Sequence, residues 1–346
     1  MCNIAGYSGK RNAAPILIEM LRRQQSFDGG LSVGVATIHE GKLHYRKVVG
    51  DVDTLLRETD AINLPGTIGI AHTRPAADAK LPHPYISMDG RMALVTNGNT
   101  PKNHYSYLTD NILKMLEEEG TVFSTELDGP KEGFPSLKNG NAISPAEARV
   151  HLVDKYIKQG MCMTEAMAKC SDEMYADNVF LTLSEDYPDS IGVCRTTRPM
   201  NILLADGETY LATTTFGFPK DVSGEVMSLP LMHAITVTSE GFNVSKHKVT
   251  REKVCEITPY AYARTYDEVA KMLYGREENP LYLDEIVNFV EKNLTDIWRE
   301  KHTYNQRVHL VYCVLEQLDY EGRLGYTLKK DTRNGVTRDL RYMWTK

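Results

Sequence analysis

Short apolar runs that end in turn residues fill the first part of the chain and return after residue 177, and this pattern constrains the fold most strongly. The predicted strands are 2–9, 67–74, 92–98, 178–183, 191–194, 200–205 and 209–214, together with a hairpin over 31–51 that turns at Glu40 and Gly41. A helical pattern over 13–25 lies between the first strand and the hairpin. Strands, two helices and then more strands indicate an α+β layered fold rather than a βαβ repeat.

Two helices separate the two groups of strands. Ser144 and Glu147 match a capping box, with Pro145 at the first helical position, and a second helix runs through 163–177. The preceding stretch 129–144 carries three Gly and two Pro. We interpret it as a solvated connection, and the alternative is a flap over a nearby site.

After residue 257 the predicted strands give way mainly to predicted helices, so we expect two parts, 2–257 and 258–346. The predicted elements of the second part are helices at 265–275, 280–298 and 308–318, and a hairpin over 323–344 that turns at Asn334 and Gly335. Helices followed by a hairpin resemble a winged-helix arrangement. Their apolar faces must be buried, either against the first part or against a second copy of the chain in a homo-oligomer.

Basic residues of the C-terminal hairpin could in principle contact a phosphate backbone. They are Lys329, Lys330, Arg333, Arg338 and Arg341. No stripe of interleaved aromatic and basic residues supports such a contact, so a solvated ribbon or a subunit contact is the favoured interpretation. The net charge of −6 likewise gives no general affinity for nucleic acid or anionic membranes.

Composition and cysteine usage are those of a reduced, globular protein. The 346 residues contain no apolar run long enough to span a membrane, and the start lacks the basic and apolar stretches of a secretory signal. The six cysteines are scattered without a CxxC pair, which argues against a zinc site and a disulfide scaffold. We therefore expect a cytoplasmic setting, with neither a metal nor an organic cofactor.

A cysteine follows the initiator methionine directly, at the edge of the first strand. Cys2 is either a small buried hydrophobe placed there by chance or a residue with chemistry of its own. Removal of Met1 would put the thiol and a free α-amine on one residue. An α-amine with a pKa of about 8 can accept the thiol proton directly or through one water, so nucleophile and base would come from Cys2 alone.

Two other strand ends offer groups that such a nucleophile needs. Asn97 can direct its side-chain amide at a developing oxyanion, and Gly98 lets a backbone N–H approach closely. Arg74, at the end of "IGIAHTR", can hold a carboxylate with its planar guanidinium. Taken alone, an Asn-Gly pair is a turn and an Arg at a strand end is a surface residue.

The motifs together resemble the class II glutamine amidotransferases, and especially the glutaminase half of glucosamine-6-phosphate synthase. They are the Met-Cys start, "IGIAHTR", the pair His83-Pro84, "NG" after an apolar strand, and "LLADGETYLATTTFGFP". The likeness covers residues 2 to about 218. It implies an N-terminal-nucleophile hydrolase fold, a four-layer αββα sandwich, with the part after 257 as a helical and hairpin extension.

The resemblance also implies roles for individual residues. Cys2 would attack the side-chain amide of glutamine, releasing ammonia and forming a glutamyl thioester that water hydrolyses. Asn97 and Gly98 would form the oxyanion hole, and Arg74 would hold the α-carboxylate of glutamine. His83 would belong to the substrate-binding side. Asp128, with Glu126 as a substitute, would hold the α-amine.

The sequence departs from the family pattern at three places, one of which is "TELDGP", where the family's Asp-Thr-Glu run is missing. Asn3 replaces the usual glycine after the cysteine, and Ala77 lacks the hydroxyl that helps to bind the substrate carboxylate. The chain after the glutaminase-like part is too short for a sugar-isomerase half, so ammonia would pass to a separate acceptor subunit or to water. The alternatives are a stand-alone amidohydrolase of a γ-glutamyl compound and a regulatory module without turnover.

Overall fold

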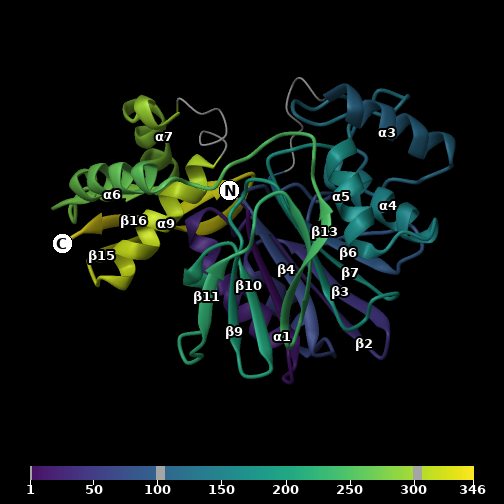
Figure 1. The fold of residues 1–346 in the computed structure, drawn as a ribbon, viewed down its shortest axis with the longest axis horizontal. Helices are drawn as coiled ribbons and strands as arrows, with labels where there is room; N and C mark the ends of the chain where they lie inside the picture. Colours follow the sequence, from purple (N-terminus) through teal and green to yellow (C-terminus); the bar gives the residue numbers. More distant parts are fainter. Residues whose placement is uncertain (1, 99–105, 299–305) are drawn as a thin grey trace.

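Two antiparallel β-sheets form the centre of the protein in a computed structural model that describes residues 2–98, 106–298 and 306–346 (Figure 1). The seven-stranded sheet has the order β11-β9-β10-β1-β4-β2-β3, and the six-stranded sheet has the order β13-β12-β8-β7-β6-β5. The first contains β1 (Asn3–Ser8), β2 (Ser32–His39), β3 (Lys42–Val49), β4 (Ile68–Arg74), β9 (Asn201–Ala205), β10 (Glu208–Ala212) and β11 (Glu225–Ser228). The second contains β5 (Tyr85–Ile86), β6 (Met92–Asn97), β7 (Val179–Ser184), β8 (Ile191–Arg195), β12 (His233–Thr238) and β13 (Gly241–Lys248).

Apolar side chains of both sheets meet in one buried layer. Ile4 and Ile70 come from the first sheet, and Val95 and Leu181 come from the second. Helices α1 and α2 pack on the outer face of the first sheet, and α4 and α5, with α3 packed against α4, cover the outer face of the second. The expected α+β fold with four αββα layers is therefore confirmed.

The helices of these outer layers are α1 (Ala13–Gln24), α2 (Val52–Glu58), α3 (Ser106–Glu118), α4 (Pro145–Lys158) and α5 (Met163–Glu173). Short 3₁₀ turns are η1 (Gln25–Phe27), η2 (Ala61–Asn63), η4 (Thr215–Gly217) and η5 (Thr295–Trp298). Among the described residues, no helix is both long and apolar enough to cross a bilayer. All six cysteines are free thiols.

The start of α4 differs from the predicted capping box. Pro145 takes the first turn as expected, but the Ser144 side chain makes no capping bond. The Glu147 carboxylate instead accepts hydrogen bonds from the backbone N–H groups of Ser124 and Thr125, at 2.6 and 2.9 Å. Glu147 is buried against the chain that follows α3, so a tertiary partner replaces the local one.

In the described ranges 258–298 and 306–346, the C-terminal part carries three helices and a small sheet in the order β14-β16-β15. Its elements are α6 (Pro259–Leu273), β14 (Leu281–Tyr282), α7 (Leu283–Asn293), α9 (Arg307–Tyr320), β15 (Leu324–Arg333) and β16 (Val336–Thr345). The predicted hairpin turn at Asn334 and Gly335 is confirmed. The predicted start of the first helix at Thr265 is wrong, because Thr258 caps Ala261 N–H and Pro259 opens the helix.

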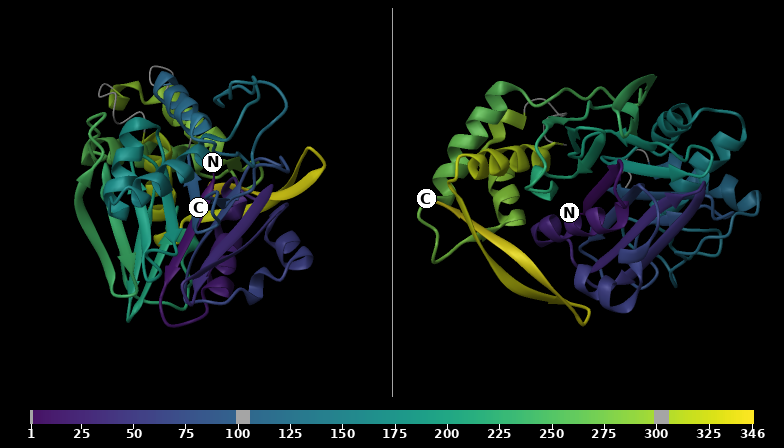
Figure 2. Two further views of the ribbon diagram at one scale, coloured as in Figure 1. Left: turned by 90° about the vertical axis from the view of Figure 1, so that its right-hand side faces the viewer. Right: turned by 90° about the horizontal axis from the view of Figure 1, so that it is seen from below.

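Helix α9 attaches the C-terminal part to the sandwich (Figure 2). Phe27, which follows α1, belongs to the same apolar cluster as α6, α7 and α9, and its ring meets that of Tyr312 edge-on at 5.5 Å. The Glu316 carboxylate accepts the Thr215 N–H at 2.7 Å. The apolar faces of the C-terminal helices are thus buried within this chain. Of the two expected arrangements, this one corresponds to packing against the first part.

The hairpin also packs on the sandwich, through two arginines that the sequence places on a solvated ribbon. Arg338 is 1% exposed, and its Nη1 donates to the carbonyl oxygens of Asp28 and Gly29 at 2.9 and 2.8 Å. Arg341 lies over the Phe27 ring at 4.4 Å. The expectation of a solvated ribbon is therefore wrong for these two side chains, since both are turned toward the 23–29 segment.

We expect Arg338→Ala to lower the free energy of unfolding by about 3 kcal/mol, because two buried carbonyls and Asp28 lose a charged donor. Chemical denaturation of the full chain measures the change. Lys330→Ala is the matched control on the same hairpin. Lys330 makes an exposed ion pair with Asp339, so its removal should change the stability far less. Equal losses in the two variants would contradict the docking role of Arg338.

Candidate active site

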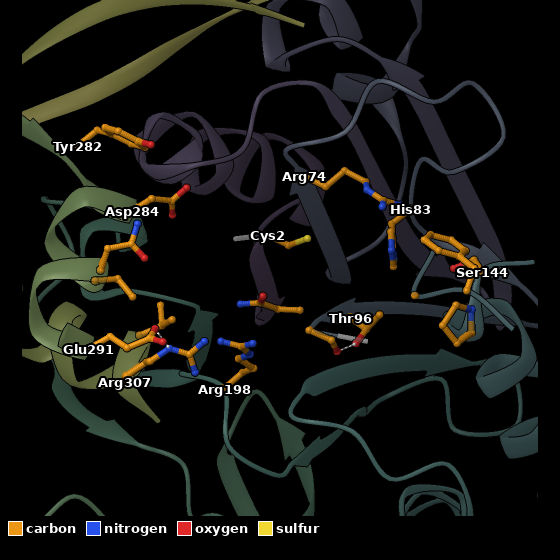
Figure 3. A pocket seen from close by; sticks show the side chains of 18 residues that line it. Cys2, Arg74, His83, Thr96, Ser144, Arg198, Tyr282, Asp284, Glu291 and Arg307 are labelled. Atoms are coloured by element: carbon orange, nitrogen blue, oxygen red, sulfur yellow. Dashed lines mark hydrogen bonds and ion pairs between the residues drawn. The ribbon is translucent and has the colours of Figure 1, made fainter. Parts of the chain in front are cut away.

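A cavity of about 530 Å³ lies where β1 begins and where β4 and β6 end (Figure 3). Five of the seven site residues named from the sequence line it: Cys2, Arg74, His83, Asn97 and Gly98. The C-terminal part supplies much of the remaining wall. The strand ends that the sequence marked are thus brought together at one place, although no two of these three strands are adjacent in sequence.

Strand register explains why Cys2 and Arg74 share this edge. β1 and β4 are antiparallel, with Asn3 opposite Thr73, so the start of one strand lies beside the end of the other. The two sheets are joined at the same edge by a hydrogen bond of 3.0 Å between His72 Nε2 and the Thr96 carbonyl oxygen. Burial lowers the pKa of His72 to about 3, so its ring is neutral and Nε2 carries the donated proton.

Asn97 and Gly98 have the features that an oxyanion hole requires. Asn97 is fully buried, and neither its Oδ1 nor its Nδ2 has a hydrogen-bond partner among the described residues. An unpartnered buried amide costs about 1–3 kcal/mol, and a catalytic role is one explanation for such a group. Gly98 has a φ of 74°, and a Cβ there would lie 2.2 Å from the Asp177 carbonyl oxygen. Only glycine fits this turn.

The Arg74 guanidinium is fixed along one edge. Its Nη1 donates to the Leu81 carbonyl oxygen at 2.7 Å and to the Tyr85 hydroxyl at 3.3 Å. Its Nε has no partner among the residues that the structure describes. A held guanidinium with donors to spare at a cavity wall can bind a carboxylate without first giving up a protein partner.

His83 stacks on His72, with ring centroids 3.9 Å apart and an interplanar angle of 24°. Burial, followed by the charges of nearby residues, lowers the pKa of His83 well below its usual value. The ring is therefore neutral. At this cavity wall, His83 can offer a hydrogen bond but no positive charge.

The two acids proposed for the substrate amine do not line the cavity. Asp128 lies in the long connection between α3 and α4, and Glu126 accepts hydrogen bonds from Asn139 and Asn141 at 2.8 and 2.6 Å. The same connection does reach the cavity through Gly133 and Phe134. That contact favours the flap alternative for 129–144 over a purely solvated connection.

Four charged residues of the cavity wall were missed from the sequence. Arg198 follows β8, Asp284 and Glu291 lie on α7, and Arg307 begins α9. Arg307 Nε donates to Glu291 Oε2 at 2.9 Å. No local motif marks these residues. Arg198 lies in a loop, and polar positions on an amphipathic helix look the same whether they face solvent or another part of the chain.

Asn3 is accommodated without crowding the start of β1. Its Nδ2 donates to the Gln24 carbonyl oxygen at 3.1 Å, and Gln24 Nε2 donates back to the Ile4 carbonyl oxygen at 2.9 Å. This exchange ties the first strand to the end of α1. The departure from the family's glycine therefore has a structural partner away from the cavity.

Curated relatives share sequence with about two thirds of the chain or more. A glutamine–fructose-6-phosphate aminotransferase of Caldanaerobacter subterraneus subsp. tengcongensis is 30% identical over 220 residues, 62% of this chain and 31% of the relative. One from Rhizobium leguminosarum bv. viciae is 35% identical over 220 residues, again 62% and 31%. One from Chlamydia trachomatis is 24% identical over 337 residues, 90% of this chain and 49% of the relative. The matches thus span about a third to a half of the relatives' length.

Solved structures of similar fold include glutamine phosphoribosylpyrophosphate amidotransferase from B. subtilis, with a TM-score of 0.59, 18% identity, and coverage of 79% of this chain and 58% of that one. The allosteric regulatory enzyme of purine biosynthesis gives a TM-score of 0.58 and 17% identity, covering 80% and 58%. No protein-family model matches the chain. The resemblance drawn from the sequence is confirmed: the chain is homologous to part of these glutamine–fructose-6-phosphate aminotransferases and shares the N-terminal-nucleophile fold of the amidotransferase structures.

Proposed function

We propose that the protein is a glutamine amidotransferase that releases ammonia from glutamine through a thioester on Cys2. The observation that carries the proposal is the buried Asn97 amide, which has no partner among the described residues and lines the same cavity as Cys2 and Gly98. A hydrogen-bond donor that is fixed in place and has no protein partner is suited to stabilise a negative charge that develops only during the reaction. Arg74 gives the same cavity a site for the substrate carboxylate.

The reaction follows from these positions. The Cys2 sulfur adds to the side-chain carbonyl carbon of glutamine, and the oxyanion receives hydrogen bonds from Asn97 and from the N–H at Gly98. The carbon–nitrogen bond then breaks, and the thiol proton leaves with ammonia. Water hydrolyses the thioester to glutamate and restores the thiol. Removal of Met1, which lies outside the described residues, would free the α-amine that carries the proton.

The acceptor of the ammonia belongs to a separate partner in this proposal. The relatives named above are two to three times longer than the stretch they share with this chain. Free thiols at all six cysteines fit the cytoplasmic setting that we propose. A stand-alone amidohydrolase of a γ-glutamyl compound is the second candidate, favoured by the extension of the cavity toward α7.

Cys2→Ala should lower the rate of glutamine hydrolysis by roughly 10⁴-fold or more, because the covalent route is lost. Ammonia release measures the rate, and mass analysis of the N-terminal peptide shows whether Met1 is removed and whether a glutamyl thioester forms. Cys162→Ala, at an exposed thiol outside the cavity, is the control and should keep full activity. Hydrolysis that survives in Cys2→Ala would refute the mechanism, and no hydrolysis in the native protein would favour the γ-glutamyl or regulatory alternatives.

Arg74→Lys should raise the KM for glutamine about tenfold or more, with a much smaller change in kcat. A lysine keeps the charge but cannot both bond Leu81 and Tyr85 and present a second edge to a carboxylate. Steady-state kinetics separate the two constants. An unchanged KM would remove Arg74 from carboxylate binding.

Asn97→Ala should lower kcat about 10²- to 10³-fold with little change in KM, since the lost donor acts on the oxyanion. Its melting temperature should stay close to that of the native protein, because the Asn97 amide has no partner to lose among the described residues. Kinetics and thermal unfolding are measured on the same sample. A large loss of stability at unchanged kcat would assign Asn97 a structural role instead.

A further inference from the structure

Another cavity lies between the sandwich and the C-terminal part, and it shares no lining residue with the cavity around Cys2. Its volume is about 610 Å³. One wall comes from the end of α1, from β9 and from the segment 215–226, and the opposite wall comes from α9 and the C-terminal hairpin. A cavity of this size is large enough to hold a small organic molecule.

Arg341 brings a buried positive charge to this cavity. The residue is 9% exposed, and its Nε and Nη2 donate to Ser26 Oγ and to the Arg23 carbonyl oxygen, both at 3.2 Å. Both acceptors are neutral. Within the described ranges, Arg341 forms no ion pair with a carboxylate, and its Nη1 makes no hydrogen bond. Burial lowers the pKa of the Arg341 guanidinium, so an anion beside it would replace solvation that the charge has lost.

The other charged groups around this cavity leave an excess of positive charge. Arg23, in the last turn of α1, and the exposed Lys220 line it together with Arg341. Asp319 is the one carboxylate among the described lining residues, and it is exposed. Behind the wall, Glu19 Oε1 lies 4.0 Å from Arg23 Nη1. Three cations therefore face two carboxylates even when Glu19 is counted, so the cavity favours an anion.

Aromatic rings form much of the wall beside these cations. Phe216 and Phe218 come from the sandwich, and Tyr326 comes from β15 on the opposite side. Tyr326 is 50% exposed, and the Arg341 guanidinium lies over its ring at 4.2 Å. Rings of this kind pack favourably against another planar group. The complementary ligand is therefore an anion that carries a flat apolar group.

We propose that this cavity binds a small aromatic phosphomonoester. The phosphate lies between Arg23 and Arg341, because the planar fork of a guanidinium matches its oxygens and a phosphomonoester carries close to two negative charges at neutral pH. The ring lies against Phe216 and Tyr326. Such a ligand touches both parts of the chain, so its binding stabilises their docking. The inference does not use Cys2 and is independent of the proposed function.

Calorimetric titration of the full chain with phenyl phosphate, glycerol 1-phosphate and inorganic phosphate tests the inference. The three probes all carry a phosphate, and only the first has a ring. We expect phenyl phosphate to bind about tenfold more tightly than glycerol 1-phosphate, because its ring packs against the aromatic wall. Phenyl phosphate should also raise the melting temperature of the protein.

Arg23→Gln should weaken the binding of phenyl phosphate about tenfold, because a charged hydrogen-bond donor to the phosphate is lost. Arg22→Gln is the matched control and should leave the affinity unchanged. Arg22 lies on the same helix, pairs with Asp53 at 2.8 Å and does not line the cavity. Lys220→Gln, at an exposed loop position, should also weaken the binding. Thermal unfolding without ligand verifies that each variant folds.

Equal affinities for phenyl phosphate and glycerol 1-phosphate would overturn the inference, because the aromatic wall would then contribute nothing. Equal affinities of Arg23→Gln and Arg22→Gln for phenyl phosphate would also overturn it, since the phosphate would then bind elsewhere. The absence of binding by all three probes would have the same consequence. None of these outcomes changes the expectation for glutamine hydrolysis, which is measured separately.

Discussion

The hydrogen bond between His72 and Thr96 holds the two sheets together at the edge where the candidate site is built. It joins β4, which ends at Arg74, to β6, which ends at Asn97. Because the His72 ring is buried and neutral, this bond does not change with pH over the range in which the protein would work. The relative positions of nucleophile, oxyanion donors and carboxylate partner all depend on the two sheets keeping this registry.

The C-terminal part packs against the sandwich. Its central helix α9 meets Phe27 and Thr215, and the hairpin arginines point at the 23–29 segment. In this arrangement Arg338 and Arg341 of the hairpin are used within the chain, while Tyr326 and Leu328 of β15 stay exposed. The division at residue 257 and the winged-helix description stay predictions, as does a homo-oligomer. What the structure adds is that the two parts share the cavity around Cys2.

The sequence predicted the parts of this structure that local rules govern. Strand ends at Arg74 and Asn97, and the hairpin turns, follow from alternation and turn chemistry that act within a few residues. The partner of Glu147 could not be predicted, since the capping pattern at Ser144 competes with distant N–H groups that only the tertiary fold brings near. Strands β11 to β13 and helices α2 and α3 were not predicted either.

The residues of the candidate site likewise divide into those that sequence motifs predict and those that only the tertiary fold reveals. Residues on the sandwich side belong to motifs whose order and spacing carry the family likeness, so Cys2, Arg74, His83, Asn97 and Gly98 were found. Asp284 was not, because α7 shows only an amphipathic pattern, and its apolar face is all that periodicity can reveal. Which polar positions face the cavity depends on the docking of α9.

A cavity with walls from both parts has a thermodynamic consequence. A ligand that touches both walls binds only when the parts are docked, so its binding free energy and the docking free energy are linked. Docking raises the affinity for such a ligand by the same factor by which the ligand stabilises docking, so a change at the contact of Arg338 with the 28–29 carbonyls that populates the undocked state weakens its binding. Small glutamine-like compounds that contact the sandwich wall alone are not subject to this coupling. Substitutions at residues far from the cavity would therefore change the affinity for ligands that touch both walls and not the affinity for these small compounds.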